Sequence, residues 1–431
     1  MAILLGIDIG TTKTACAVLD SGRGALLFCA SEAHHAEIAP GLQDPAKHFL
    51  LVEKMMRSIP GDLKNNISAV GVTGQMHGVV LWNQYGNISP LYTWQSTVPD
   101  FARITAIEPA LCQGFGITTL AHLQAENKLT SYTFSGTIMD YVVWQLTGQP
   151  ERVMIDQTNA ASWGAYDLHR HSFRGEVLER LSIPDRLLPE IVPPGTRAGE
   201  LKWGRDADLP YGIPVMAAVG DNQASVFFTS HDPEKELFLT IGTGSQLSAV
   251  TESVESGSTC EYRPYPDGRY LAVAAPLCGG ASWALLADLF RQTLTAYGVV
   301  VPDEATLYRK LDDMALTEIN SADLPLIQPH FLGERYDAAL RGGIGNLTLN
   351  NVMPGKLAAG FALGIIRTLR DSLPENVRES RTQLLCSGNA IRRNQSLQKA
   401  CTICFGMPCQ FPENREEAAC GAALLAERLL D

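Results

Sequence analysis

The sequence predicts an α/β protein built from two lobes, and three observations lead to this prediction. The chain has 431 residues, more than one ordinary hydrophobic core accommodates, so two domains are expected. A strand–turn–strand pattern occurs twice, around Gly10 and again around Gly242. Apolar runs of strand length also alternate with longer segments of helical spacing. We place the boundary near residue 227, which gives an N-terminal lobe over residues 1–227 and a C-terminal lobe over residues 228–431.

Local patterns predict the elements in chain order. In the first lobe, apolar runs indicate strands over residues 3–9, 13–19, 67–72 and 214–219, and a short strand over 162–166. Helical spacing indicates helices over 45–57 and over 134–146, the second ended by Gly148. Three prolines indicate that residues 187–200 cross without a regular element. In the second lobe we expect strands over 237–241, 246–250 and 383–386, and helices over 281–297, over 357–371 and from 416 to the end.

The composition restricts the partners. The formal net charge of −12 opposes binding to nucleic acid or to an anionic membrane surface, because both repel an acidic protein. No apolar run has the length of a membrane span, and the apolar start is interrupted by Asp8 and lacks the basic residues of a secretory signal. We therefore expect a cytoplasmic protein with a small molecule as its main ligand. A homodimer is compatible with the sequence.

The 10 cysteines are scattered and mostly lie among apolar or small residues, which is typical of reduced, buried thiols. One cluster has a second interpretation, because Cys401 and Cys404 form a C-x-x-C pair followed by Cys409. Such a pair can bind zinc or cycle as a dithiol. No second pair or nearby histidine completes a four-ligand site, so a structural role in a helix is expected.

The first motif with chemical meaning is the turn Gly10-Thr11-Thr12, which follows Asp8 at the end of a strand. A glycine between strands lets the backbone approach a phosphate closely, and the amides and hydroxyls of Thr11 and Thr12 can donate to its oxygens. An aspartate at a strand end can hold Mg²⁺, directly or through water. Taken alone, the motif could equally be an ordinary hairpin turn.

The turn Gly242-Thr243-Gly244 repeats this arrangement in the second half of the chain. The presence of two such turns favours a nucleotide-binding site to which each lobe contributes one phosphate-binding turn. No G-x-x-x-x-G-K-[ST] string is present, so a P-loop is not the device used. A third turn contains Gly388 and Asn389, between a strand and a helix, where glycine would let an adenine lie flat on the backbone. Turns of this kind are common, and its position relative to the other two motifs is what supports the interpretation.

Asp221 is the candidate catalytic residue. It follows a buried strand at the expected lobe boundary, where a carboxylate could face both lobes. Phosphoryl transfer needs a carboxylate that accepts the proton of the attacking hydroxyl, together with a metal that neutralises charge. The alternative role is that of an N-cap for the following helix, and one side chain can serve both roles.

These motifs, in this order, resemble the FGGY family of carbohydrate kinases, within the actin-like ATPase superfamily. The resemblance extends over nearly the whole chain and includes Ser162-Trp163-Gly164, Asp167 and residues 417–424. It implies two ribonuclease-H-like α/β lobes with a central cleft, Asp8 for Mg²⁺ and Asp221 for the base. It also implies that ATP is bound through Gly10, Thr11, Thr12, Gly242, Thr243 and Gly244 at its phosphates and through Gly388 and Asn389 at its adenine.

The expected sugar site is also implied by resemblance. Residues 74–78 look like the substrate loop of the family, and strings around residues 75–80, 93–95, 136–143, 159–164 and 332–335 are similar to its sedoheptulose-phosphorylating branch. Polar groups can read the hydroxyls of a polyol, and an exposed indole can stack on its carbon chain. The residues expected to contact the sugar are Gln75, Met76, His77, Trp94, Gln95 and Asn222. The alternative for Trp94 is a core aromatic.

The expected reaction is ATP-dependent phosphorylation of a terminal hydroxyl of sedoheptulose, with D-xylulose or D-ribulose as alternatives. After Trp94 and Gln95 the family continues with Asp-x-Arg, whereas this chain has Ser96 and Val98, so a carboxylate and a guanidinium are absent. Two other functions stay open: an actin-like or chaperone-like ATPase that binds a protein, and a catalytically weakened sugar-binding relative. The polyol loop together with Asp221 favours the kinase, since a protein-binding ATPase needs no such loop.

Overall fold

The structure is a computed structural model that describes residues 2–202, 209–242, 244–255, 260–334, 337, 339–412 and 416–430. The chain forms two compact units: unit 1 contains Met1–Thr229, Arg263–Gly268 and Asn414–Asp431, and unit 2 contains Ser230–Tyr262 and Arg269–Glu413. The first crossing, after Thr229, lies beside the expected boundary near residue 227. Two later segments that we expected in the C-terminal lobe belong to unit 1.

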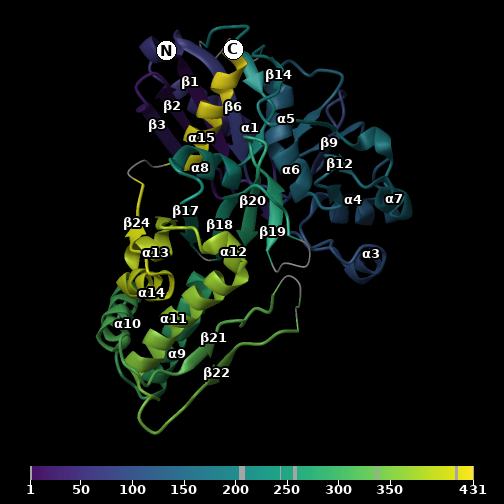
Figure 1. Ribbon diagram of the computed structural model, residues 1–431. Coiled ribbons are helices and arrows are strands. Elements are labelled where there is room, and N and C mark those ends of the chain that lie inside the picture. Colours follow the sequence, from purple (N-terminus) through teal and green to yellow (C-terminus); the bar gives the residue numbers. More distant parts are fainter. Residues whose placement is uncertain are drawn as a thin grey trace. The chain divides into compact units, whose positions relative to one another are not determined.

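Unit 1 is built on a mixed sheet with helices on both faces (Figure 1). Its strands are β1 (Ile3–Ile9), β2 (Lys13–Asp20), β3 (Ala25–Ala33), β4 (Glu37–Ala39), β5 (Leu42–Gln43), β6 (Ile67–Gly74), β7 (Val80–Trp82), β8 (Leu91–Tyr92), β9 (Phe134–Gly136), β10 (Met154–Asp156), β11 (Tyr166–Asp167), β12 (Ser172–Phe173), β13 (Glu190–Val192), β14 (Arg197–Glu200), β15 (Pro214–Met216) and β16 (Val219–Gly220). Its helices are α1 (Pro45–Ser58), α2 (Gly61–Lys64), α3 (Phe101–Ile107), α4 (Gly116–Ala125), α5 (Ile138–Leu146), α6 (Gln157–Ser162), α7 (Gly175–Arg180), α8 (Asp221–Thr229) and α15 (Glu417–Ala426).

The main sheet of unit 1 has the order β14-β15-β6-β1-β2-β3, and β16 also pairs with β6. Strands β1, β2 and β3 form an antiparallel meander, whereas β6, β15 and β16 run parallel to β1. The hairpin between β1 and β2 closes at the predicted turn, where Gly10 N donates to Lys13 O at 3.0 Å. The predicted strands over residues 3–9, 13–19 and 67–72 are confirmed.

The chain end returns to unit 1 because α15 packs directly onto this sheet, close to α8 (Figure 1). A Cβ on Gly6 of β1 would lie 1.8 Å from Ala419 O, and one on Gly71 of β6 would lie 1.9 Å from Ala422 O. Glycines on the strands and alanines on the helix therefore allow a backbone approach that larger side chains would prevent. This long-range packing could not be predicted from the local pattern of residues 417–426.

Unit 2 repeats the central part of the unit 1 sheet, in which three antiparallel strands are followed by strands parallel to the first. Its main sheet has the order β19-β20-β18-β17-β23-β24, with β17, β18 and β20 antiparallel and β23 and β24 parallel to β17. Its strands are β17 (Glu236–Ile241), β18 (Ser245–Thr251), β19 (Glu261–Pro264, which crosses into unit 1 after Tyr262), β20 (Tyr270–Ala274), β21 (Leu326–Gln328), β22 (Gly343–Gly345), β23 (Gln383–Ser387) and β24 (Cys409–Gln410). Its helices are α9 (Gly280–Ala296), α10 (Glu304–Glu318), α11 (Pro354–Ser372), α12 (Glu375–Arg378), α13 (Asn389–Arg393) and α14 (Gln395–Phe405).

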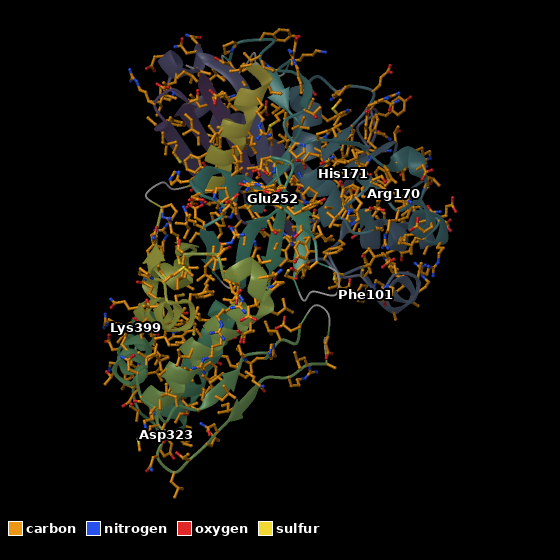
Figure 2. The ribbon with its side chains drawn as sticks, in the orientation of Figure 1. Phe101, Arg170, His171, Glu252, Asp323 and Lys399 are labelled. Carbon is orange, nitrogen blue, oxygen red and sulfur yellow. The ribbon has the colours of Figure 1, made fainter. Side chains whose placement is uncertain are left out.

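The core of unit 2 lies between this sheet and helices α9, α10, α11 and α14, and Cys401 is part of it. In unit 2, Asp323 (labelled in Figure 2) anchors the segment after β22, because it accepts hydrogen bonds from Thr348 Oγ1 and Asn351 Nδ2, both at 3.0 Å. In the described part of the chain, no helix is long and apolar enough to cross a membrane.

Three local predictions were wrong, and the single strand expected over 214–219 is divided into β15 and β16. The helix expected over 134–146 begins only at Ile138, because Thr137 caps it: Thr137 Oγ1 accepts from Asp140 N, and the Asp140 carboxylate accepts from Thr137 N. Residues 134–136 instead form β9, paired with β7. The strand expected over 162–166 is the end of α6, followed by a turn and then β11.

The third error concerns residues 187–200, which contain β13 and β14 despite their prolines. β13 pairs with β10, and β14 pairs with β15 at the edge of the main sheet. Pro189, Pro193 and Pro194 all lie outside these two short strands, so no ladder hydrogen bond is lost.

Candidate active site

Several predicted site residues of unit 1 meet at one edge of its sheet. In the parallel ladder Asp8 of β1 pairs with Thr73 of β6, and Gly220 of β16 pairs with Gly74 of β6. Because parallel strands end at the same edge, Asp8, the loop after Gly74 and Asp221 all emerge there.

The carboxylates at this edge repel one another. Burial, followed by the charges of Asp221 and Glu416, raises the pKa of Asp8 to about 7, and Lys13 opposes this increase. Burial also raises the pKa of Asp221 to about 6, against the hydrogen bond from Asn222 N at 2.7 Å and the charge of Arg263. Lys13 is itself engaged with Glu416, at an Nζ–Oε1 distance of 2.5 Å. The edge therefore favours an additional cation.

Asp8 provides a fitting ligand for such a cation. Its Oδ1 atom is buried and accepts no hydrogen bond from the described residues. Among those residues, no group of three or more His, Cys, Asp or Glu side chains could hold a metal alone. Mg²⁺ does not require such a group, because it commonly binds through one or two carboxylates together with substrate phosphates and water. The residues present thus fit a Mg²⁺–phosphate complex.

Asp221 is the first residue of α8, and the strand before it is held by side chains that we did not predict. Thr73 Oγ1 donates to Val219 O, Gly220 N donates to Thr158 Oγ1, and Asn159 Nδ2 donates to Ala218 O, each at 2.8 Å. These contacts restrict the path of the backbone into Asp221. Of the three, only Asn159 lies in a string, residues 159–164, that the family resemblance had noted.

Arg263 is another residue that sequence reasoning missed. It is buried, it belongs to the short segment Arg263–Gly268 that returns to unit 1, and its charge lowers the pKa of Asp221. Gln223 Nε2 of α8 donates to Pro264 O at 3.3 Å and so ties this segment to the helix that Asp221 begins. The residue next to Asp221, Asn222, has a buried Nδ2 with no partner among the described residues.

The loop after β6 has one accessible side chain and two covered ones. Gln75 and Met76 are 2% and 4% exposed, and the Met76 thioether packs against Gly220. His77, at φ 72°, is half-buried and stacks on Phe115 with ring centroids 5.0 Å apart. Its Nδ1–H donates to Ser162 O at 2.7 Å, so in the neutral imidazole Nε2 is a hydrogen-bond acceptor.

Trp94 and Gln95 are exposed, so the alternative of Trp94 as a core aromatic is wrong: its side chain is 40% exposed. Its Nε1–H donates to Thr11 Oγ1 at 3.0 Å, which joins an expected sugar residue to an expected phosphate residue. Ser96 is buried with an unpaired Oγ among the described residues, and Val98 belongs to a hydrophobic cluster of unit 1. The side chains of Ser96 and Val98, which stand where the family has aspartate and arginine, are therefore buried in the protein.

In unit 2 the other two turns lie side by side. Strands β17 and β23 are parallel, with Thr240 opposite Ser387 and their hydroxyl oxygens 2.8 Å apart, so the turns after them are neighbours. Gly388 has φ 94°, and a Cβ there would lie 2.4 Å from Ile241 O, so only glycine fits. Gly242 N donates to Gly244 O at 2.9 Å, and Thr243 lies outside the described residues.

Asn389, the first residue of α13, opens onto a cavity of about 980 Å³ within unit 2. Its wall combines aromatic and polar side chains, which suits a flat, hydrogen-bonding ligand. The lining residues are Trp283, Asp303, Glu304, Ala305, Tyr308, Arg309, Asp312, Asp313, Asn389, Ala390, Arg393, Asn394 and Gln395.

Solved structures with similar folds include two kinases of small carbohydrates. A gluconate kinase from Lactobacillus acidophilus superposes with a TM-score of 0.83 at 19% identity, covering 100% of this chain and 89% of that one. A ligand-bound xylulose kinase from the same organism gives a TM-score of 0.82 at 19% identity, covering 100% and 90%. These likenesses confirm the predicted fold class, an α/β protein of two lobes.

Sequence comparisons agree. The model of the FGGY family of carbohydrate kinases, N-terminal domain, matches residues 113–228. The sedoheptulokinase of Homo sapiens is 30% identical over 475 aligned residues, covering 99% of this chain and 97% of that protein. The sedoheptulokinase of Mus musculus is 29% identical, covering 98% and 97%. With a match of this identity over almost the full length of both proteins, the chain belongs to the FGGY family of carbohydrate kinases.

Proposed function

We propose that this carbohydrate kinase transfers the γ-phosphate of ATP to a terminal hydroxyl of sedoheptulose. The observation that carries the choice of sugar is the identity of 30% and 29% to two sedoheptulokinases over 97% of their length. A xylulose kinase from Streptomyces coelicolor is 24% identical and a glycerol kinase from Gloeobacter violaceus 26%, covering 88% and 87% of those proteins.

Asp221 would act as the general base. A carboxyl group with a pKa of about 6 is mostly ionised at neutral pH and is more basic than an ordinary aspartate, so it can accept the proton of the attacking hydroxyl. The contacts from Thr73, Thr158 and Asn159 to the preceding strand support this role, because a base must be held in position.

The sugar would lie against the accessible residues of the loops. His77 Nε2 can accept a hydrogen bond from a hydroxyl, the exposed indole of Trp94 can stack on the carbon chain, and Gln95 can read further hydroxyls. Gln75 and Met76, which are covered, would form the floor of the site. Asn222, beside the proposed base, would donate to the sugar from its Nδ2, which has no partner in the described part of the chain.

The nucleotide would be bound by the glycine turns of both units. Gly10 and the turn over residues 242–244 would let the backbone approach the phosphates closely, and the amides and hydroxyls of Thr11 and Thr12 would donate to their oxygens. The cavity beside Gly388 and Asn389 would hold the adenine. Asp8 would hold Mg²⁺, which would supply positive charge to neutralise the phosphates.

Membership of a carbohydrate-kinase family disfavours a protein-binding ATPase, so the pentulose kinases are the alternative to test. Each additional hydroxyl read by a buried polar partner contributes about 0.5–1.5 kcal/mol net, and a shorter sugar leaves such partners unpaired. We expect kcat/KM for sedoheptulose to exceed that for D-xylulose by more than about tenfold. His77→Ala should shrink this ratio, and the exposed His169→Ala serves as the matched control.

Side-by-side kinetics on C5 to C7 ketoses with ATP and Mg²⁺ decide the matter. A higher kcat/KM for D-xylulose or D-ribulose would refute the sedoheptulose assignment but would not affect the assignment as a carbohydrate kinase. Sugar binding without any turnover on these ketoses would instead indicate the weakened sugar-binding relative.

A further inference from the structure

We propose that the bound sugar strengthens nucleotide binding through Thr11, and that Trp94 and Gln43 position Thr11. This inference rests on the proposed function, because it takes Trp94 to contact the sugar and Thr11 to contact a phosphate. It adds a route inside unit 1 that joins the two binding sites.

The first contact reaches the side chain of Thr11. The Trp94 indole donates its Nε1–H to Thr11 Oγ1 at 3.0 Å. A hydroxyl oxygen that accepts this bond still has its own proton to donate, and the acceptor bond limits the directions in which that proton can point. An indole that is fixed by a stacked sugar would therefore hold the Thr11 hydroxyl in one orientation. Because Trp94 is 40% exposed, its side chain is expected to keep conformational entropy in the sugar-free protein, and stacking on a sugar would remove part of that entropy.

The second set of contacts reaches the backbone of Thr11. His34 Nε2 lies 2.6 Å from Thr11 O, and Gln43 Nε2 donates to the same oxygen at 3.0 Å. The tautomer of His34 is determined, since its Nδ1 accepts from Ala36 N at 2.9 Å and Nε2 must therefore carry the proton. Both lone pairs of the Thr11 carbonyl are thus occupied, which holds the peptide plane of the turn.

Gln43 extends this network to the sugar loop. Its Oε1 accepts from Gln75 Nε2 at 3.0 Å and from His48 Nε2 at 2.9 Å. Burial, with the neighbouring His34 ring, lowers the pKa of His48 to about 3, so this histidine is neutral and donates a single proton to Gln43. Gln75 Nε2 also lies 3.4 Å from Gly10 O. One buried amide therefore connects the sugar loop with the phosphate turn.

The physical consequence is cooperative binding. A ligand that orders a group needed by a second ligand removes part of the entropy cost of the second binding step. The coupling must be reciprocal, so the nucleotide should strengthen sugar binding by the same factor. A neutral hydrogen bond contributes modestly, so we expect the Trp94–Thr11 contact to account for a factor of about 2 to 12.

The test is a binding cycle measured by isothermal titration calorimetry. The Kd of the nonhydrolysable analogue AMP-PNP, with Mg²⁺, is measured without sugar and with saturating sedoheptulose, and the ratio is the coupling factor. Trp94→Phe retains an aromatic ring but removes the N–H. It should change the sugar Kd by less than about threefold and lower the coupling factor by about 2- to 12-fold. Trp94→Ala, which also removes the stacking surface, should weaken sugar binding itself.

Thr11→Val supplies the second arm of the cycle. If Trp94 acts through Thr11, adding Trp94→Phe to Thr11→Val should not lower the coupling factor further. An unchanged factor in Trp94→Phe, or equal losses in both backgrounds, would overturn the inference. A wild-type protein that binds both ligands without coupling also overturns it and leaves the proposed function intact. A wild type that binds neither ligand refutes the proposed function and this inference with it.

Discussion

Asp221→Asn should have two opposite effects, a large loss of turnover and a gain in thermal stability at alkaline pH. The amide keeps the size of the side chain, and its oxygen can still accept the hydrogen bond from Asn222 N, so the start of α8 should persist. The loss of the carboxylate removes the proposed base. A general base typically contributes a factor of about 10²–10⁴, so we expect kcat to fall by at least about 10².

The stability effect follows from the raised pKa. Burial raises the pKa of Asp221 from 3.8 to about 6, so the folded protein binds this proton more tightly than the unfolded chain does. The ionisation of Asp221 therefore costs stability progressively as the pH rises from about 4 to about 6, and the full cost applies above that range. Because the side chain is half-buried, solvent screening reduces this cost to about 1 kcal/mol, which corresponds to about 2–4 °C in Tm.

Two measurements check this reasoning, with the exposed Asp62→Asn as the control. ADP release with sedoheptulose and MgATP gives kcat, and thermal melts at pH 5 and pH 8 give the change in Tm. The Tm gain should be larger at pH 8 than at pH 5, and wild-type kcat/KM should decline below about pH 6 as Asp221 is protonated. Near-wild-type turnover would remove Asp221 from the mechanism, and a lower Tm at pH 8 would refute the electrostatic argument.

The other predictions probe unit 2. Apart from the chain neighbours of Gly242, no described atom lies within 4 Å of a Cβ at this position, so Gly242→Val should leave Tm unchanged. The same variant should weaken AMP-PNP binding and have little effect on sugar affinity. Weakened sugar binding alone would contradict the assignment of the turn. Gly388→Ala should lower both Tm and nucleotide affinity, because an alanine there would have a positive φ and would clash with the backbone. An unchanged Tm would show that the turn can relax. Replacing Cys401, Cys404 and Cys409 by Ser or Ala should leave activity and metal content unchanged, whereas stoichiometric zinc or iron in the purified wild type would establish a metal role.

Short-range patterns were sufficient for the elements that carry the turns. The runs before Gly10 and Gly242 are apolar enough to form buried strands, and glycine interrupts them, so both hairpins could be located from neighbouring residues alone. The start of α5 could not be located in this way, because the Thr137 cap competes with helical spacing that continues on both sides of it. The family resemblance, which sums weak signals over the whole chain, identified the fold class and the kinase activity.

Local sequence patterns were enough to identify the residue types suited to the chemistry: the carboxylates Asp8 and Asp221, the glycine turns and the loop with His77. Which of these residues meet, and what supports them, depends on the packing of whole elements. The return of Arg263 to the side of Asp221, the packing of α15 on β1 and β6, and the contact between Trp94 and Thr11 all join residues far apart in the chain. Such contacts leave no periodic trace in the sequence, because they depend on how whole elements pack rather than on the residues beside them.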